Sequence, residues 1–427
     1  MAVLLSKKVI RVALLSSVVL LFLGLLSGHQ DVQEYMPDSV RDMHSSVKGS
    51  LTGVWGGRTE AVVEETKSDA GVAHADSGAE RSKAPAKAKE PAEEWMRKPA
   101  PVQADGKVRA SFVSLVRNSQ LEGIIPAIKL VEQRFNHKYH YPWLFLNDEP
   151  FNEEFKTEIR KVVSSEARFE TIPKEHWSFP EWIDQDKAAE TREKMKGIIY
   201  GDSVSYRHMC RFESGFFWRH PALEDYDWYW RVEPDTKLFC DIDYDVFRWM
   251  QDNDKVYGFT ISIHEFQATI PTLWETTTNF IKKHPEYVAK DNMQGFISDD
   301  NGKTYNLCHF WSNFEIASLN FWRSKPYREY FDYLDQAGGF FYERWGDAPV
   351  HSIAASLFLP KDKIHFFNDI AYYHGPFTHC PIEKDVFQKG NCDCNPDDDF
   401  TFQGYACGHK YYEVNSMKKP PGYERFQ

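Results

Sequence analysis

The sequence predicts an α/β fold, a mixed and mainly parallel sheet flanked by helices, and one strand–helix–strand unit carries this prediction. Residues 108–116 (VRASFVSLV) and 143–146 (WLFL) are apolar runs typical of buried strands. Between them, residues 121–135 place apolar side chains at helical spacing. A right-handed crossover of this kind makes the two strands adjacent and parallel.

Later segments extend the same pattern along the chain. Strand-like runs occupy residues 256–263 (VYGFTISI) and 364–373 (IHFFNDIAYY). Helical patterns fill residues 151–160, 187–196, 206–219, 273–283, 326–336 and 350–358. Neither a G-x-G-x-x-G fingerprint nor a Walker loop is present, so the sequence supports no dinucleotide fingerprint and no P-loop.

The central stretch of the chain is 225–235 (DYDWYWRVEPD). Its large strand-favouring residues predict a buried strand, which should stop near Glu233 because Pro234 cannot donate a ladder hydrogen bond. Glu233 and Asp235 then lie at the carboxyl end of the strand, where open α/β sheets bind ligands. Two carboxylates there suit a divalent metal held against a diphosphate, and they also suit a solvated acidic turn. The residues alone leave both interpretations open.

Composition limits the class of partner. The chain has 427 residues and a net charge of −12, which argues against binding to nucleic-acid phosphates. Aromatic residues make up 15% of the chain, and such rings stack on sugars as well as filling cores.

The N-terminus predicts a membrane anchor. Basic residues at positions 7, 8 and 11 flank the uncharged apolar run 12–26. We expect a cytosolic tail at residues 1–8, a single-pass signal anchor at 9–26 and a disordered stalk at 27–106, rich in Ala, Glu, Lys and Pro. The domain at 107–427 then faces the lumen. The alternative is a cleaved signal peptide.

Four of the seven cysteines lie in the C-terminal tail. Cys392 and Cys394, followed by Cys407 and His409, suggest a zinc site as one interpretation. The C-x-C spacing is unusual for zinc and a lumenal compartment is oxidising, so disulfides are favoured. Their pairing stays open.

Several other polar residues are candidates for chemistry. Arg117 follows the first predicted strand and is placed to meet a nucleotide. Asp241 and Asp243 form a D-x-D, although Asp243 or Asp245 suits the cap of a following helix.

Glu315 and Asp347 are two more candidates. Glu315 is a lone charge in the aromatic run 310–321, where it needs either a structural partner or a function. Asp347 suits a helix cap, and the basic residues of 206–219 suit either phosphates or ordinary salt bridges, the second being more common.

Five segments together resemble one family, the fungal glycolipid 2-α-mannosyltransferases (glycosyltransferase family 15). They are 206–217 (YRHMCRFESGFF), 229–235 (YWRVEPD), 309–315 (HFWSNFE), 345–349 (WGDAP) and 364–374 (IHFFNDIAYYH). The resemblance implies a GT-A-like fold in one large lumenal domain, a single-pass type II protein of the Golgi membrane, GDP-mannose as donor, a mannosylated glycan as acceptor, and Mn²⁺.

The resemblance also implies site residues. By motif, Glu233 and His374 match metal-binding positions and Glu315 matches the carboxylate proposed as nucleophile. Tyr206 and Asp347 match donor- and acceptor-site residues, whereas Arg117 rests on the strand-end argument alone. The expected reaction is a retaining α-1,2-mannosyl transfer, by double displacement or by a front-face route. The alternatives are a lumenal glycoside hydrolase and a non-catalytic mannan-binding protein. No nucleic-acid partner is expected, and the sequence does not predict an oligomeric state.

Overall fold

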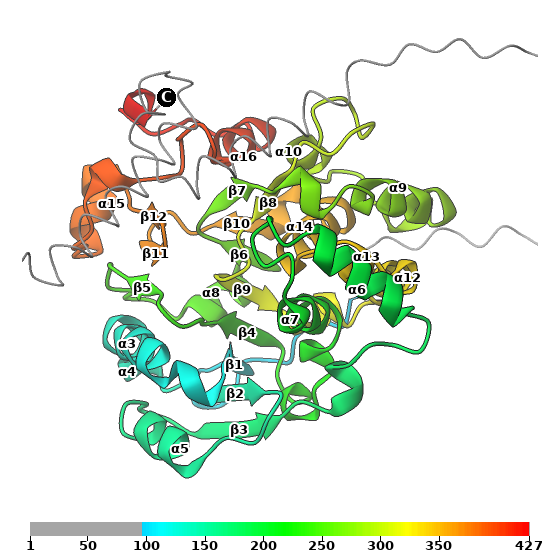
Figure 1. The fold of residues 1–427 in the computed structure, drawn as a ribbon. Coiled ribbons are helices and arrows are strands. Elements are labelled where there is room, and N and C mark those ends of the chain that lie inside the picture. The colour runs from blue at the N-terminus through cyan, green and yellow to red at the C-terminus, as the bar shows by residue number, and fades with distance from the viewer. Residues whose placement is uncertain (1–95, 427) are drawn as a thin grey trace, which may run out of the picture. The chain divides into compact units, whose positions relative to one another are not determined.

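A computed structural model describes residues 96–426 of the chain, and a seven-stranded sheet forms its centre (Figure 1). The strand order is β10-β6-β9-β4-β1-β2-β3. In chain order the strands are β1 (Ala110–Leu115), β2 (Trp143–Asn147), β3 (Ala167–Thr171), β4 (Trp228–Arg231), β6 (Tyr257–Phe259), β9 (Glu315–Ser318) and β10 (Ile364–Phe366). Only β9 runs antiparallel to its neighbours β4 and β6. The predicted mixed, mainly parallel sheet is therefore confirmed.

Helices cover both faces of this sheet. In chain order the α-helices of residues 96–426 are α3 (Leu121–Val131), α4 (His137–Tyr139), α5 (Glu153–Arg160), α6 (Gln185–Lys194), α7 (Val204–Gly215), α8 (Val246–Asp252), α9 (Leu273–Lys283), α10 (Gln294–Ile297), α11 (Leu319–Trp322), α12 (Lys325–Ala337), α13 (Gly339–Tyr342), α14 (Asp347–Phe358), α15 (Lys384–Lys389) and α16 (Gly408–Val414). Figure 1 shows α3 and α5 on one side of the sheet and α7, α12 and α14 on the other.

Two apolar cores result, because successive side chains of a strand point to opposite faces. Phe112 of β1 packs in the core that contains the inner faces of α3, α5 and α8. Its neighbour Val113 packs in the core that contains those of α7, α12 and α14. In β4, Trp228 and Trp230 face the first core and Tyr229 faces the second. Arg231, two residues after Tyr229, therefore points toward α7 and α14.

Polar caps begin the helices that build the site side of the sheet. The Ser203 hydroxyl accepts a hydrogen bond from the Tyr206 N–H at the start of α7, and the Ser324 hydroxyl does the same for Tyr327 in α12. Asp245 caps α8, as one of the two predicted alternatives stated. Such caps satisfy backbone donors that have no partner within the helix.

The predicted strand–helix–strand unit is confirmed, because β1 and β2 are adjacent and parallel. Two predicted strands were wrong in extent. The run 256–263 splits into β6 and β7 (Ser262–His264), and β7 pairs with β8 (Cys308–Phe310) outside the main sheet. The run 364–373 splits into β10 and β11 (Tyr372–His374), and β11 joins β5 (Lys237–Leu238) and β12 (Phe377–His379). A continuous apolar run in the sequence does not reveal where one strand ends and the next strand begins to pair in a different sheet.

The predicted disulfides are present, and the structure supplies their pairing. The bonds are Cys240–Cys392, Cys308–Cys407 and Cys380–Cys394. Among the described residues Cys210 is the one free cysteine, and it is buried in α7.

Contacts of the folded domain begin upstream of the predicted boundary at residue 107. The Ala100 N–H donates to the Asp227 carboxylate at 2.8 Å, and Met96 packs against the core. No helix within residues 96–426 is long and apolar enough to cross a membrane. The predicted anchor at 9–26 lies outside the described residues.

Candidate active site

Arg231 is the centre of a buried charge cluster where β4 ends. Its Nη1 lies 2.7 Å from Asp347 Oδ2 on α14 and 3.8 Å from Glu213 Oε2 on α7. Its Nη2 donates to Glu233 Oε1. Burial opposes the charged form of Arg231, but the Glu213, Glu233 and Asp347 carboxylates raise its pKa well above the ordinary value. A permanent cation thus joins the predicted metal side of the site to Asp347.

Asp347 is not the helix cap that the sequence suggested. Gly346 occupies the cap position, and Asp347 is the first residue of α14. Its Oδ2 accepts hydrogen bonds from Arg231 and from the Ser312 hydroxyl, both at 2.7 Å. Although burial acts in the opposite direction, Arg231 lowers the pKa of Asp347. The carboxylate is ionised and directed at the charge cluster.

Glu233 and His374 meet because β5 pairs with β11. β5 begins four residues after Glu233, and Tyr373 of β11 is the register partner of Lys237. His374 Nε2 then lies 4.0 Å from Glu233 Oε2. Both side chains are partly exposed, at 28% and 23%. Trp311 contacts the His374 ring edge-on, with centroids 5.0 Å apart.

Asp235, the second carboxylate predicted at this strand end, has different surroundings. It is exposed, its backbone has a φ of 62°, and its N–H donates to the Gly123 carbonyl at 3.1 Å. A Cβ at Gly123 would lie 2.9 Å from Asp235 Oδ1, so the carboxylate packs closely on α3. Asp235 therefore belongs to the turn after β4, and it packs this turn against α3.

Glu315 starts β9 directly opposite Arg231 of β4, and its side chain is fully buried. Oε1 accepts from the Tyr257 hydroxyl at 2.8 Å and contacts His351 Nδ1 at 2.8 Å. Oε2 accepts from the Tyr229 hydroxyl at 2.7 Å. Each carboxylate oxygen is therefore bound by side chains of the core on the α14 side.

Arg117 contacts the start of helix α7 beside Tyr206. Arg117 follows β1, as predicted, and its guanidinium donates to the Ser205 hydroxyl. Tyr206 is the next residue, and burial raises the pKa of its hydroxyl well above the ordinary value. The Arg344 guanidinium lies over the Tyr206 ring, 5.1 Å from its centroid.

Sequence reasoning missed three residues of this cluster: Arg231, Glu213 and His351. Arg231 carried a usable signal, since a charge within the strand-favouring run 228–232 needs buried partners. Strand alternation would also have placed it on the face of Tyr229. Glu213 and His351 had no such signal, because each lies in an ordinary helical pattern.

The D-x-D pattern makes structural contacts instead. Asp241 Oδ1 lies 2.8 Å from Arg134 Nη1, and Asp243 pairs with Lys138. Asp245 Oδ1 accepts from the Arg248 N–H at 3.1 Å as the cap of α8. These aspartates bind the turn before α8 to the helical segment after α3.

Two of the basic residues of 206–219 are ordinary ion-pair partners, whereas Arg207 donates to the backbone carbonyls of Ser203 and Glu343. Arg211 binds the Asp335 carboxylate through two hydrogen bonds of 2.7 and 2.8 Å. Arg219 pairs with Asp332 at 3.1 Å.

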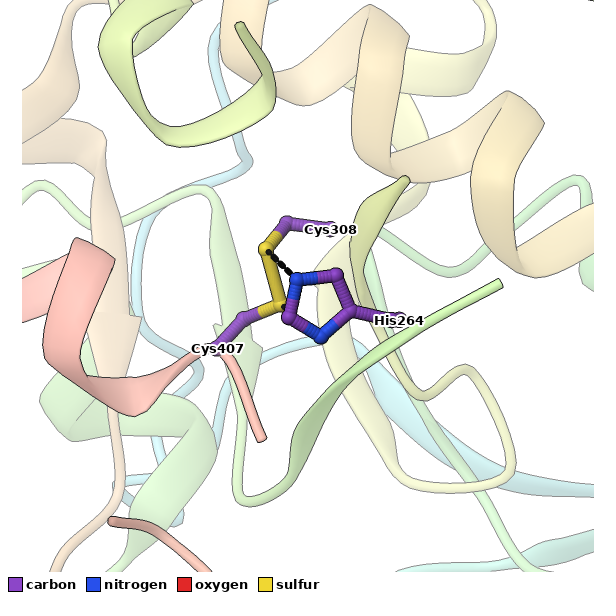
Figure 2. Close-up of side chains that lie close together, drawn as sticks. All are labelled: His264, Cys308 and Cys407. Carbon is purple, nitrogen blue, oxygen red and sulfur yellow. Dashed lines mark hydrogen bonds between the residues drawn. A yellow bond between two sulfur atoms is a disulfide. The ribbon is translucent and has the colours of Figure 1, made fainter. Parts of the chain in front are cut away.

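Within residues 96–426, His264, Cys308 and Cys407 form the one group of three histidine, cysteine or carboxylate side chains whose ligand atoms cluster closely enough for a metal. Figure 2 shows that the two cysteines form a disulfide beside the imidazole ring. Oxidised sulfurs are not thiolate ligands, so this group is a covalent brace between β8 and α16 and not a zinc site.

The chain is similar to known proteins over nearly its whole length. A family model described as glycolipid 2-alpha-mannosyltransferase matches residues 65–416. The glycolipid 2-alpha-mannosyltransferase of Saccharomyces cerevisiae is 54% identical over 441 residues, covering 100% of both chains. Glycolipid 2-alpha-mannosyltransferase 2 of Candida albicans is 63% identical over 323 residues, covering 75% of this chain and 70% of the relative.

Solved structures agree with these matches. Core-mannan synthase A of Aspergillus fumigatus, in an Mn/GDP form, aligns with a TM-score of 0.70 at 41% identity, over 79% of this chain and 93% of that one. The sheet, its covering helices and this likeness define a glycosyltransferase with the predicted GT-A-like fold. The chain belongs to the glycolipid 2-alpha-mannosyltransferase family.

Proposed function

We propose that this chain is a retaining α-1,2-mannosyltransferase that moves mannose from GDP-mannose to mannose-terminated glycans of glycoproteins or glycolipids. The observation that carries the proposal is the position of Arg231, which hydrogen-bonds both Glu233 and Asp347. One cation thereby ties the metal and donor side of the site to the acceptor side. Family membership supports the same activity.

Glu233 and His374 would hold Mn²⁺. Their facing atoms are 4.0 Å apart, a separation that one ion with bonds of about 2 Å can span. Arg231 occupies the other oxygen, Oε1, so Oε2 is the one directed at the histidine. An imidazole with a carboxylate suits Mn²⁺ better than Mg²⁺, and the bound ion would neutralise charge on the departing GDP as a Lewis acid.

The remaining site residues would bind and orient the two substrates. Tyr206 would contact the donor together with Arg117, whose guanidinium binds the adjacent Ser205 at the start of α7. The ionised Asp347, fixed through its Oδ2, would accept a hydrogen bond from the acceptor hydroxyl.

Glu315 is our candidate nucleophile. It is buried and held by three side chains, and Oε2 has only the Tyr229 hydroxyl, whereas Oε1 has two partners. Attack by Oε2 would form a glycosyl ester at the anomeric carbon while the bond from that carbon to GDP breaks, and it would give up only the hydrogen bond from the Tyr229 hydroxyl. In a front-face route, Glu315 would serve only as a fixed negative charge.

The cellular setting belongs to the same proposal. We place the chain in the Golgi membrane as a single-pass type II protein with its domain in the lumen. The apolar run 12–26 after three basic residues supports this orientation. The three disulfides within the domain agree with an oxidising compartment.

One assay tests the function. The purified full-length chain is incubated with radiolabelled GDP-mannose and mannose, methyl α-mannoside or mannobiose, with and without Mn²⁺, and the product linkage is determined. We expect an α-1,2-linked product that requires the metal and the acceptor. Mannoside hydrolysis without GDP-mannose would contradict the proposal, as would mannan binding without GDP release.

A further inference from the structure

Three segments of the chain bring His264, Cys308 and Cys407 together. His264 ends β7 and is the register partner of Cys308, which begins β8. The Cys407 N–H donates to the carbonyl oxygen of Ser262, also in β7, at 3.0 Å. Backbone hydrogen bonds therefore hold these three segments side by side in addition to the disulfide. Side chains on paired segments of this kind are well placed to bind one ligand together.

A backbone carbonyl decides which ring nitrogen of His264 has a free lone pair. Nδ1 lies 3.0 Å from the Tyr405 carbonyl oxygen, which only accepts hydrogen bonds, so Nδ1 carries the proton. Nε2 then presents its lone pair, and it lies 3.4 Å from Cys308 Sγ (Figure 2). Histidines that bind metals commonly have this arrangement, in which one nitrogen donates to a carbonyl and the other faces the ion.

The distances in this group suit a zinc ion once the cysteines are thiols. Zn²⁺ binds thiolate sulfur at about 2.3 Å and imidazole nitrogen at about 2.0 Å in a tetrahedron, which places two such ligand atoms about 3.5 Å apart. The 3.4 Å between Nε2 and Cys308 Sγ matches this separation. One ligand atom from each of the three residues lies within 4.8 Å of the others. Both cysteines are buried and His264 is half-buried, so the histidine side can admit the ion and a water as fourth ligand.

We propose that His264, Cys308 and Cys407 bind one Zn²⁺ in the thiol form of the chain, the form that exists before the disulfide is made. Binding releases the two thiol protons, because the thiolate is the ligand. Two sulfurs with an imidazole favour Zn²⁺ over Mn²⁺, which prefers oxygen ligands. The ion would hold β7, β8 and the start of α16 together until the covalent bond replaces it.

The exchange of the ion for the disulfide balances as a thiol–disulfide reaction. The two thiolates give two electrons to a disulfide oxidant, which takes up two protons and becomes a dithiol. The bond between Cys308 Sγ and Cys407 Sγ forms, and Zn²⁺ leaves because the oxidised sulfurs are no longer thiolate ligands. Within residues 96–426 neither Cys380 nor Cys394 belongs to a comparable group, so their disulfide serves as an internal control.

Zinc titration of the reduced full-length chain tests the site. The chain is reduced with a phosphine in the absence of denaturant, and Zn²⁺ is added in competition with a chromophoric chelator. We expect one ion per reduced chain and none in the oxidised protein. Cys308→Ser and His264→Gln should each bind the ion at least about a hundredfold more weakly, whereas the matched control Cys380→Ser should bind it like the wild type. Binding of wild-type strength in Cys308→Ser would assign the ion to other cysteines and overturn the inference.

Oxidative refolding provides a second test that needs no stable reduced state. Free thiols are trapped at intervals, and mass spectrometry follows the Cys308–Cys407 and Cys380–Cys394 bonds in the same chain. Saturating Zn²⁺ should delay the first bond about tenfold and leave the second unchanged, because the ion occupies only the thiolates of the first pair. His264→Gln, a change at a half-buried position, should remove the delay. An equal delay of both bonds, or no delay of either, would overturn the inference.

Discussion

His351 Nδ1 lies 2.8 Å from Glu315 Oε1, and His351 Nε2 lies 3.1 Å from the Glu213 carbonyl oxygen. A carbonyl oxygen only accepts hydrogen bonds, so Nε2 of His351 carries a proton, and Glu315, against the effect of burial, raises the pKa of His351 and thus favours a second proton on Nδ1. Both side chains are buried, and the Trp322 ring stacks on the imidazole at 4.3 Å. His351 and Glu315 thus form a buried pair in which Glu315 favours the protonated imidazole.

This pair predicts a pH dependence of stability. Burial favours neutral His351, but Glu315 outweighs it and raises the pKa above the ordinary value of about 6.5. The pair's stabilisation is complete below the unfolded pKa and is lost as pH rises through the folded one. Urea denaturation from pH 6 to 9 should show a fall in unfolding free energy that His351→Gln removes. If the unfolding free energy of the variant fell just as steeply with pH, the His351–Glu315 pair would be excluded as the cause of the fall.

Glu213 leads us to expect a second pH dependence of the unfolding free energy, at lower pH than that of His351. Burial raises its pKa to about 7, despite the nearby Arg231. Between the ordinary value and 7 the folded protein holds the proton that the unfolded chain has released, so stability falls as pH rises. Glu213→Gln should flatten the profile of unfolding free energy from pH 5 to 7. A steeper profile in the variant would contradict the assignment.

Glu315→Gln tests the nucleophile. The amide keeps the size of the side chain but cannot form a glycosyl ester, so kcat should fall by about a hundredfold or more with the Kd for GDP-mannose unchanged. Turnover and equilibrium binding are measured on the same preparation. A near-normal kcat would remove Glu315 as nucleophile and leave the front-face route.

Glu233→Ala tests the metal pair, and Asp235→Ala is its matched control two residues away. Losing Glu233 should abolish Mn²⁺-dependent turnover while the circular dichroism spectrum is kept, because one of the two proposed protein ligands is gone. Asp235 packs on Gly123 and not on His374, so its variant should retain turnover. Full activity of Glu233→Ala over a Mn²⁺ titration would end the metal assignment.

Much of the local structure was readable from neighbouring residues. The strand–helix–strand unit, the end of the strand before Pro234 and the cap at Asp245 all follow from side chains within a few positions. The observed strand β4 ends at Arg231, two residues before the predicted end near Glu233. The five motif segments were also sufficient to indicate the family, which the comparisons confirm.

The meeting of distant residues was not readable in this way. Asp347 looked like a cap, because nothing nearby in sequence shows that Arg231 lies across the fold to bind it. The runs 256–263 and 364–373 looked continuous, because apolar strands in different sheets have the same composition.

The sequence by itself determined the class of fold and the family, since periodicity and motif identity are local properties of a chain. Only the tertiary structure decided that His374 reaches Glu233 through the β5–β11 pairing and that His351 binds Glu315. Contacts across the fold depend on which strands pair and which helix faces they bury. Those choices belong to the packed domain as a whole and not to any single segment.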